Sequence, residues 1–182
     1  MVNLGFLVLR CFYFMLPAYF ANMAPVISKN WLKFLAKPVD FGAKFKGKEL
    51  FGKNKTFRGF VFGVLFAIII AYLQFLLYRF DFFNGLSFID YSNWILVGFL
   101  LGFGALLGDL VKSFFKRRAG ISSGKPFVPW DQLDFVIGSL VLVSFVTTLS
   151  WERLTYIAII SVVGHVVVNH AAFYLKIRNE KW

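Results

Sequence analysis

The chain is poor in charged residues and in cysteine, and both shortages restrict the class of protein. Only 16% of its 182 residues are charged, whereas 59% are hydrophobic. A soluble domain carries about 25% charged residues, so this chain has too few to cover a water-exposed surface. Much of its surface must therefore face lipid. The single cysteine, Cys11, lies within an apolar run, which excludes a disulfide framework and a thiol-based metal site.

Acidic residues are also scarce, with 9 Asp and Glu against 20 Lys and Arg, and the formal net charge is +11. Such a balance can indicate nucleic-acid binding. In a membrane protein, however, basic loops report sidedness and contact anionic lipid headgroups. We therefore predict membrane lipid, and no nucleic acid, as the partner of these bases. Without an internal repeat or a low-complexity tail, residues 1–182 are predicted to form a single transmembrane domain.

Five apolar segments approach the length of about 20 residues that a helix needs to cross a bilayer. The first lacks the basic leader and the cleavage site of a signal peptide, so we expect it to be retained as a membrane helix. The predicted spans are residues 4–24, 60–80, 94–110, 135–151 and 154–175. The predicted fold class is therefore an all-α integral membrane protein with about five transmembrane helices.

The connections between these spans differ in charge. Residues 25–59 contain nine Lys and Arg and residues 111–134 contain five, whereas residues 81–93 contain two acids and no base. Three further bases follow the last span, at Lys176, Arg178 and Lys181. Because Lys and Arg collect on the cytoplasmic side, we predict a multi-pass cell-membrane protein with its N-terminus outside. Loops 25–59 and 111–134 and the C-terminus would then be cytoplasmic.

One junction, GDLVKSFFKRRAGISSGKPFVPWDQLD at residues 108–134, mixes acids with bases. An acid within a membrane helix costs about 2.5–3.5 kcal/mol, so Asp109 is expected to face a cavity or a partner. Helical spacing puts Asp109, Lys112, Ser113 and Lys116 on one stripe. Arg118 lies off this stripe, so we expect its replacement to have a mild effect.

Asp131 and Asp134 share a face at the start of the next predicted span. Asp131 could cap that helix, with Asp134 in its first turn, and capping does not exclude metal binding. Helices joined by a short loop are usually neighbours, so both acids are expected to lie near Asp109. Clustered carboxylates repel unless a cation relieves them, and hard oxygen ligands favour Mg²⁺. We therefore predict that Asp109, Asp131 and Asp134 bind Mg²⁺.

Basic side chains around such a site would suit a polyphosphate ligand. Metal and bases together are what phosphoryl or nucleotidyl transfer requires. The predicted catalytic residues are accordingly the three acids with the four nearby bases, Lys112, Lys116, Arg117 and Lys125.

This junction resembles the signature of the CTP-dependent lipid cytidylyltransferases. The matching residues are Ser113, Lys116, Arg117, Asp131 and Asp134. The His-Gly-Gly of the bacterial and eukaryotic phosphatidate enzymes is absent, because Val128, Pro129 and Trp130 stand near that place. The chain is also shorter. Both departures point to the archaeal branch, the CDP-archaeol synthases.

Two further stretches resemble the same branch. PAYFANMAPV at 17–26 is similar to its first-helix motif, and KPVDFGAKFKGKELFGKNKTFRG at 37–59 is similar to its first cytoplasmic loop. The resemblance implies that CTP or the lipid phosphate binds to residues from these stretches and from the junction: Asn22, Asp40, Lys53, Lys55, Thr56, Arg58 and Ser113.

The resemblance also implies a reaction. CMP would pass from CTP to an isoprenoid ether-lipid phosphate, 2,3-bis-O-geranylgeranylglycerol 1-phosphate, in a site that faces the cytoplasm. The products would be a CDP-lipid and pyrophosphate. The alternative is a non-enzymatic lipid flippase or small-solute transporter. Such a protein should carry polar groups near mid-membrane, and the candidates are Arg10, His165 and Asn169.

Overall fold

The computed structural model describes residues 4–174, without the side chains of residues 168, 169, 171 and 172. Within this range the chain is mostly helical, as predicted. The α-helices are α1 (Leu4–Ile27), α2 (Phe57–Leu77), α3 (Asp81–Leu86), α4 (Trp94–Arg118), α5 (Trp130–Val143) and α6 (Trp151–Tyr174). Two 3₁₀ turns, η1 (Ser28–Asn30) and η2 (Lys33–Leu35), and a hairpin of β1 (Lys44–Phe45) and β2 (Lys48–Glu49) lie between α1 and α2.

Three segments of the described chain are long and apolar enough to cross a membrane: Leu4–Asn30, Phe57–Leu77 and Trp94–Arg118. They correspond to the first three predicted spans. The fifth predicted span, 154–175, overlaps α6 up to residue 174, and residue 175 and the three bases of the C-terminal segment lie outside the described residues. The number of spans and their sidedness remain predictions.

The fourth predicted span, 135–151, differs from the helix that forms there. The helix α5 begins earlier, at Trp130, ends at Val143, and has 14 residues. Five of the seven residues at 144–150 are serine, threonine or valine, whose side chains favour local hydrogen bonds or extended backbone over helix. Ser144 Oγ donates to the carbonyl oxygen of Val141 at 2.7 Å, and Ser150 Oγ accepts from the N–H of Arg153 at 3.4 Å. The apolar run thus contains the end of one helix and the start of another.

The second predicted cytoplasmic loop, 111–134, is also shorter than expected. The helix α4 continues to Arg118, and α5 already begins at Trp130, so the irregular connection is confined to residues 119–129. The helix persists because Ser113, Lys116 and Arg117 bury their side chains on the face that looks toward the rest of the protein. The charged junction is therefore carried mainly by two helices.

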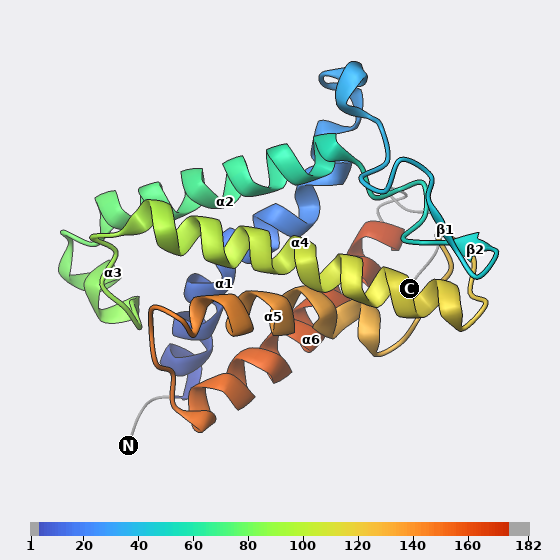
Figure 1. Cartoon of the computed structure of the whole chain (residues 1–182). Helices are drawn as coiled ribbons and strands as arrows, with labels where there is room; N and C mark the ends of the chain where they lie inside the picture. Colours follow the sequence, from blue (N-terminus) through green and yellow to red (C-terminus); the bar gives the residue numbers. More distant parts are fainter. Residues whose placement is uncertain (1–3, 175–182) are drawn as a thin grey trace.

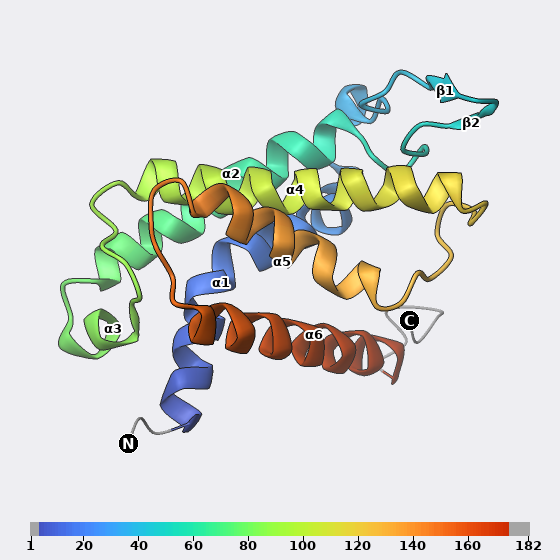
Figure 2. The ribbon, with the colours of Figure 1, turned by 60° about the horizontal axis from the view of Figure 1, so that its bottom comes forward.

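The helices form one packed bundle in which α5 lies between α4 and α6 (Figure 1, Figure 2). At one end are α3 and the connection between α5 and α6, and at the other are the hairpin and the connection between α4 and α5 (Figure 1). The core between them is built from fully buried side chains, among them Phe14, Tyr91, Leu101 and Phe135. The two polar loops thus meet at one end of an apolar bundle.

Glycines bring α4 and α5 into backbone contact. A Cβ atom on Gly108 would lie 2.0 Å from the carbonyl oxygen of Asp134, and one on Gly138 would lie 2.1 Å from that of Gly104. Small residues allow membrane helices to approach this closely. Because Asp109 follows Gly108 directly, the contact also places Asp109 beside Asp134.

Candidate active site

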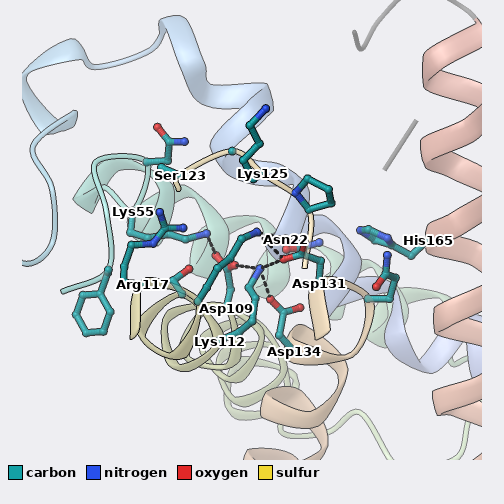
Figure 3. Close-up of a pocket in the computed structure, with 17 residues that line it drawn as sticks. Asn22, Lys55, Asp109, Lys112, Arg117, Ser123, Lys125, Asp131, Asp134 and His165 are labelled. Carbon is teal, nitrogen blue, oxygen red and sulfur yellow. Dashed lines mark hydrogen bonds and ion pairs between the residues drawn. The ribbon is translucent and has the colours of Figure 1, made fainter. Parts of the chain in front are cut away.

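A cavity of about 250 Å³ lies at the hairpin end of the bundle (Figure 3). Its walls come from α1, the loop before α2, α4, the 119–129 connection, α5 and α6, and we call it the polar pocket. Of the fourteen predicted site residues, ten line it: Asn22, Lys55, Asp109, Lys112, Ser113, Lys116, Arg117, Lys125, Asp131 and Asp134. Segments far apart in the sequence therefore converge on one place.

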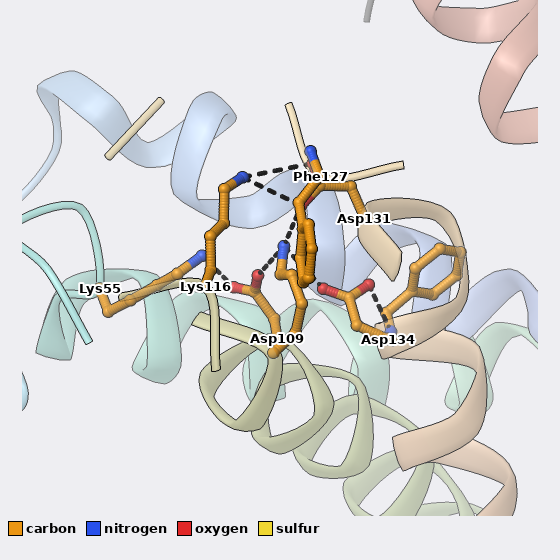
Figure 4. A network of polar contacts seen from close by, with 8 residues as sticks. Lys55, Asp109, Lys116, Phe127, Asp131 and Asp134 are labelled. Atoms are coloured by element: carbon orange, nitrogen blue, oxygen red, sulfur yellow. Dashed lines mark hydrogen bonds and ion pairs between the residues drawn. The ribbon is translucent and has the colours of Figure 1, made fainter. Parts of the chain in front are cut away.

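The three predicted metal-binding carboxylates surround the ammonium of Lys112 (Figure 3). Figure 4 shows the same three aspartates within the wider network of polar contacts. Its Nζ atom lies 3.1 Å from Asp109 Oδ1, 2.7 Å from Asp131 Oδ1 and 2.9 Å from Asp134 Oδ2. Lys112 reaches Asp109 along its own helix, at i and i+3, and reaches the other two acids across the glycine contact with α5. The acids thus come together as their spacing predicts, with a lysine at their centre.

Two more lysines extend this network. Lys55, from the loop before α2, forms an ion pair with Asp109, although 54 residues separate them. Lys116 lies one turn beyond Lys112 on α4, and its Nζ atom is 3.3 Å from both carboxylate oxygens of Asp131. Because these side chains are largely buried, each charge needs its opposite nearby to offset the loss of water.

Asp131 has a second role at the start of α5. Its Oδ2 atom accepts the N–H of Phe127 at 2.5 Å, so the carboxylate holds the connection that leads into the helix. Burial alone would raise the pKa of Asp131, but the hydrogen bond and the charge of Lys112, with the Phe127 N–H, hold it below the ordinary value. Asp131 is therefore ionised at neutral pH.

The donor set fits a hard divalent cation. Within residues 4–174, no three acidic, histidine or cysteine side chains are arranged as a ready-made metal cluster. Instead, oxygens from three carboxylates converge within 3.1 Å of one positively charged nitrogen, that of Lys112. Carboxylate oxygens are the ligands that Mg²⁺ prefers, and it usually takes one or two of them together with phosphates and water. The residues therefore suit Mg²⁺.

The pocket also contains cationic groups that the acids do not neutralise. Its walls carry five basic and three acidic side chains. Arg117 is 8% exposed, and its Nε atom has no hydrogen-bond partner in the described part of the chain. A buried guanidinium with an unused donor is suited to an anionic ligand such as a phosphate.

Four predicted site residues do not line the pocket: Asp40, Lys53, Thr56 and Arg58. Lys53 is exposed, and Arg58 donates to the carbonyl oxygen of Trp31 at 3.4 Å. Thr56 caps α2, because its Oγ1 atom accepts the N–H of Gly59 at 3.2 Å. Thr56 and Arg58 thus make contacts within the first loop and the start of α2.

Asp40 acts on the same loop. Its two carboxylate oxygens accept the N–H groups of Gly42 at 2.9 Å and Phe51 at 3.1 Å. Phe51 itself lines the polar pocket, so Asp40 fixes the path of a wall segment from outside the cavity.

Several lining residues were absent from the prediction, among them Asn54, Ser123, Gln132 and His165. Gln132 lies between Asp131 and Asp134 in the sequence. Only the structure, which buries its side chain against the pocket, identifies it as a lining residue. His165 belongs to α6, and its ring lies 6.2 Å from that of Phe135. Nothing in the local sequence connects it with Asp134, which is 31 residues away.

Of the three polar groups that could have indicated transport, Arg10 lies far from this pocket. It donates to the carbonyl oxygen of Ser87 at 2.8 Å, in the connection at the opposite end of the bundle, and stacks over the Phe88 ring. His165 lines the polar pocket, and the side chain of Asn169 lies outside the described part of the chain.

A protein-family model described as CDP-archaeol synthase, CarS-like, matches residues 3–182. The chain belongs to the CDP-archaeol synthase family. The CDP-archaeol synthase of Methanocaldococcus jannaschii is 37% identical over 172 residues, which cover 93% of this chain and 94% of that protein. The one from Thermococcus kodakarensis is 36% identical and covers 94% of each chain. The one from Methanococcus aeolicus is 33% identical over the full length of both.

A solved structure agrees with this membership. It is described as an intramembrane enzyme for archaeal membrane lipids biosynthesis, and it is similar to this chain with a TM-score of 0.73 and 29% identity. The match covers 87% of this chain and 91% of that one. The resemblance drawn from the sequence motifs is therefore confirmed, and the chain is a membrane-embedded enzyme of the CDP-archaeol synthase type. Membership in an enzyme family favours the cytidylyltransferase over the transporter.

Proposed function

We propose that this chain transfers CMP from CTP to 2,3-bis-O-geranylgeranylglycerol 1-phosphate, giving a CDP-lipid and pyrophosphate. The observation that carries the proposal is the meeting of three carboxylates and five basic side chains in one pocket. Nucleotidyl transfer needs both kinds of group, since the acids can hold a metal ion and the bases can hold phosphate oxygens. The names of the relatives supply the nucleotide and lipid classes.

The proposed topology has five spans, the N-terminus outside, and the polar pocket at the cytoplasmic face. The basic loops 25–59 and 111–134 are both associated with the hairpin end of the bundle, whereas the base-free connection 81–93 is at the other end (Figure 1). Positive charge on the cytoplasmic side then supports this orientation. The pocket would meet CTP from the cytoplasm and lipid from the inner leaflet.

In the proposed reaction an oxygen of the lipid phosphate attacks the α-phosphorus of CTP. A new P–O bond forms, the bond from the α-phosphorus to the bridging oxygen of the β-phosphate breaks, and pyrophosphate leaves with the electron pair. No general base is required, because a phosphate monoester already carries negative charge near neutral pH. The main barrier is the approach of one anion to another.

The basic side chains lower that barrier. Arg117 and Lys116 are buried in the pocket wall, and Lys125 stands on its exposed connection. Fixed cations in a partly dehydrated site stabilise the developing negative charge without reorganisation during the reaction. Arg117 can present two donors to one phosphate, which also fixes its orientation.

Asp109, Asp131 and Asp134 would hold Mg²⁺, which when bound neutralises phosphate charge and stabilises the departing pyrophosphate. Lys112, now paired with all three acids, lines the same cavity, so its ammonium is placed to contact a phosphate.

A substrate panel tests the proposal. Purified protein in detergent micelles is incubated with Mg²⁺, one of four labelled nucleoside triphosphates, and an ether- or ester-linked lipid phosphate. We expect CDP-lipid and equimolar pyrophosphate from CTP with the isoprenoid ether lipid. Folded protein that yields no nucleotidyl lipid from any combination would contradict the proposal and favour the transporter.

A further inference from the structure

A second cavity, about 600 Å³ in volume, opens beside the polar pocket on the outer face of α4 and α5. Ten of its twelve lining residues are apolar or glycine, and the rim side chains Val111, Phe115 and Trp130 are more than half exposed. We call this cavity the α4–α5 groove. Its exposed apolar walls suit hydrocarbon and not a nucleotide.

The two charged residues of the α4–α5 groove are Lys112 and Asp134. Both also line the polar pocket, so the groove and the pocket share a wall. Gly108 and Gly138 line the groove where the backbones of α4 and α5 touch. A molecule lying in the groove would therefore reach the charged cluster directly.

The groove continues along α5. Ile137 and Val141 line it and also line a further apolar hollow of about 550 Å³ that extends to Trp151. The 14 residues of α5 extend for about 21 Å. One leaflet of the hydrocarbon core is about 15 Å deep, half of the whole, so this path is long enough for the chains of a lipid of the inner leaflet.

We propose that the isoprenoid chains of the lipid phosphate lie in the α4–α5 groove and along α5, with the phosphate passing beside Lys112 into the polar pocket. The inference rests on the proposed function, which supplies a lipid phosphate as the acceptor. Lys112 would attract the phosphate at the only place where the groove carries a positive charge. The lipid and CTP would then approach the carboxylates from different sides.

The competing location is a groove between α1 and α6. It also meets the polar pocket, through Asn22 and His165, and its other walls include Phe12 and Phe20. Its volume is about 190 Å³, and no Lys, Arg, Asp or Glu is among its lining residues. It offers a lipid phosphate less room and no lysine or arginine.

Photocrosslinking distinguishes the two grooves without turnover. The wild-type protein is irradiated, without CTP, with an isoprenoid ether-lipid phosphate that carries a photoreactive group in one chain, and crosslinked peptides are identified by mass spectrometry. We expect crosslinks at Val111, Phe115, Ile137 and Val141 that excess unlabelled lipid phosphate suppresses. Suppressible crosslinks at Phe12 and Phe20 instead, or none that the competitor suppresses, would overturn the proposal.

A kinetic experiment adds an independent readout. Val141→Trp should fill the groove and raise the KM for the long-chain lipid phosphate about tenfold or more. A loss of affinity of this size is expected when a few apolar groups of the lipid can no longer be buried. The KM for CTP, and turnover of a short-chain lipid phosphate, should stay within about twofold of wild type.

Val163→Trp is the matched control, because Val163 is 56% exposed on α6 and lines none of the four cavities described here. A long-chain KM unchanged by Val141→Trp, or equal changes in both variants, would refute the location. If wild-type protein makes no CDP-lipid, the proposed function is wrong. The location of the lipid chains is tested separately, by the positions of the crosslinks.

Discussion

The guanidinium of Arg118 donates a hydrogen bond of 2.6 Å to the carbonyl oxygen of Phe45, and so joins the last residue of α4 to the β-hairpin. The same group donates to the carbonyl oxygens of Glu49 at 2.6 Å and Lys48 at 3.3 Å. The hairpin belongs to the loop that delivers Lys55 to Asp109. Arg118 therefore holds a wall of the polar pocket without lining it.

Arg118→Ala is the first prediction. Helical spacing alone predicts a mild effect, whereas these contacts predict a rise of about tenfold in the KM for CTP, since hydrogen bonds to charged groups contribute about 1.5–3 kcal/mol. Faster proteolysis near the hairpin should accompany it. Lys44→Ala, on the same hairpin and exposed, serves as the control. If Arg118→Ala has the KM and the proteolysis rate of the wild type, the mild effect predicted from helical spacing is correct and the role given to the hairpin contacts is wrong.

Removing Lys112 should expose the repulsion among the acids. In metal-free buffer, Lys112→Met should lower the free energy of unfolding by about 3 kcal/mol, because three largely buried carboxylates lose their shared cation. Mg²⁺ should recover much of that loss by binding the native state. Thermal unfolding with EDTA and with Mg²⁺ measures both effects.

Lys125→Met is the control for this measurement, because Lys125 is exposed. Equal stability of Lys112→Met with and without Mg²⁺ would show that the three acids do not hold the ion.

Asp109→Asn should reduce kcat by about 100-fold or more, as expected when a group that supports charge stabilisation in the transition state is lost. Membrane insertion should be retained, because the amide keeps the shape of the side chain. Asp81→Asn, an exposed acid at the opposite end of the bundle, should retain wild-type kcat. Wild-type turnover in Asp109→Asn would remove this residue from the proposed metal site.

Gly138→Ala tests the contact between α4 and α5. The added methyl group would lie 2.1 Å from the carbonyl oxygen of Gly104, so the helices must separate. Overpacking of this kind costs about 1–3 kcal/mol of stability, and the separation should also lower kcat by moving Asp134 from Asp109. Gly164→Ala, whose Cβ would meet nothing within 4 Å, is the matched control. Equal activity in the two variants would contradict the role given to the contact.

Local periodicity was sufficient to predict the centre of the site. Asp109, Lys112 and Lys116 share a helical face, and Asp131 and Asp134 follow after a short connection, so their meeting needs only that α4 and α5 are neighbours. Hydropathy likewise located α1, α2 and α4. It did not locate the end of α5, because residues 144–150 are apolar enough to extend the run but prefer a non-helical backbone.

Other parts of the site depend on tertiary packing that no short segment encodes. Lys55 reaches Asp109 from 54 residues away, and Asn22 and His165 come from the first and last helices. Arg118 shows the same limit, since its hairpin contacts span about 70 positions in the sequence. Motif resemblance proposed Asn22 and Lys55 for the site, but the resemblance gave no geometric reason for either.

The backbone contact between Gly108 and α5 has a mechanical consequence. Because α4 and α5 touch along their main chains, we expect them to move little relative to each other when a ligand binds. We then expect adjustment to an arriving nucleotide to occur mainly in the hairpin loop, which long side chains such as Arg118 and Lys55 join to α4.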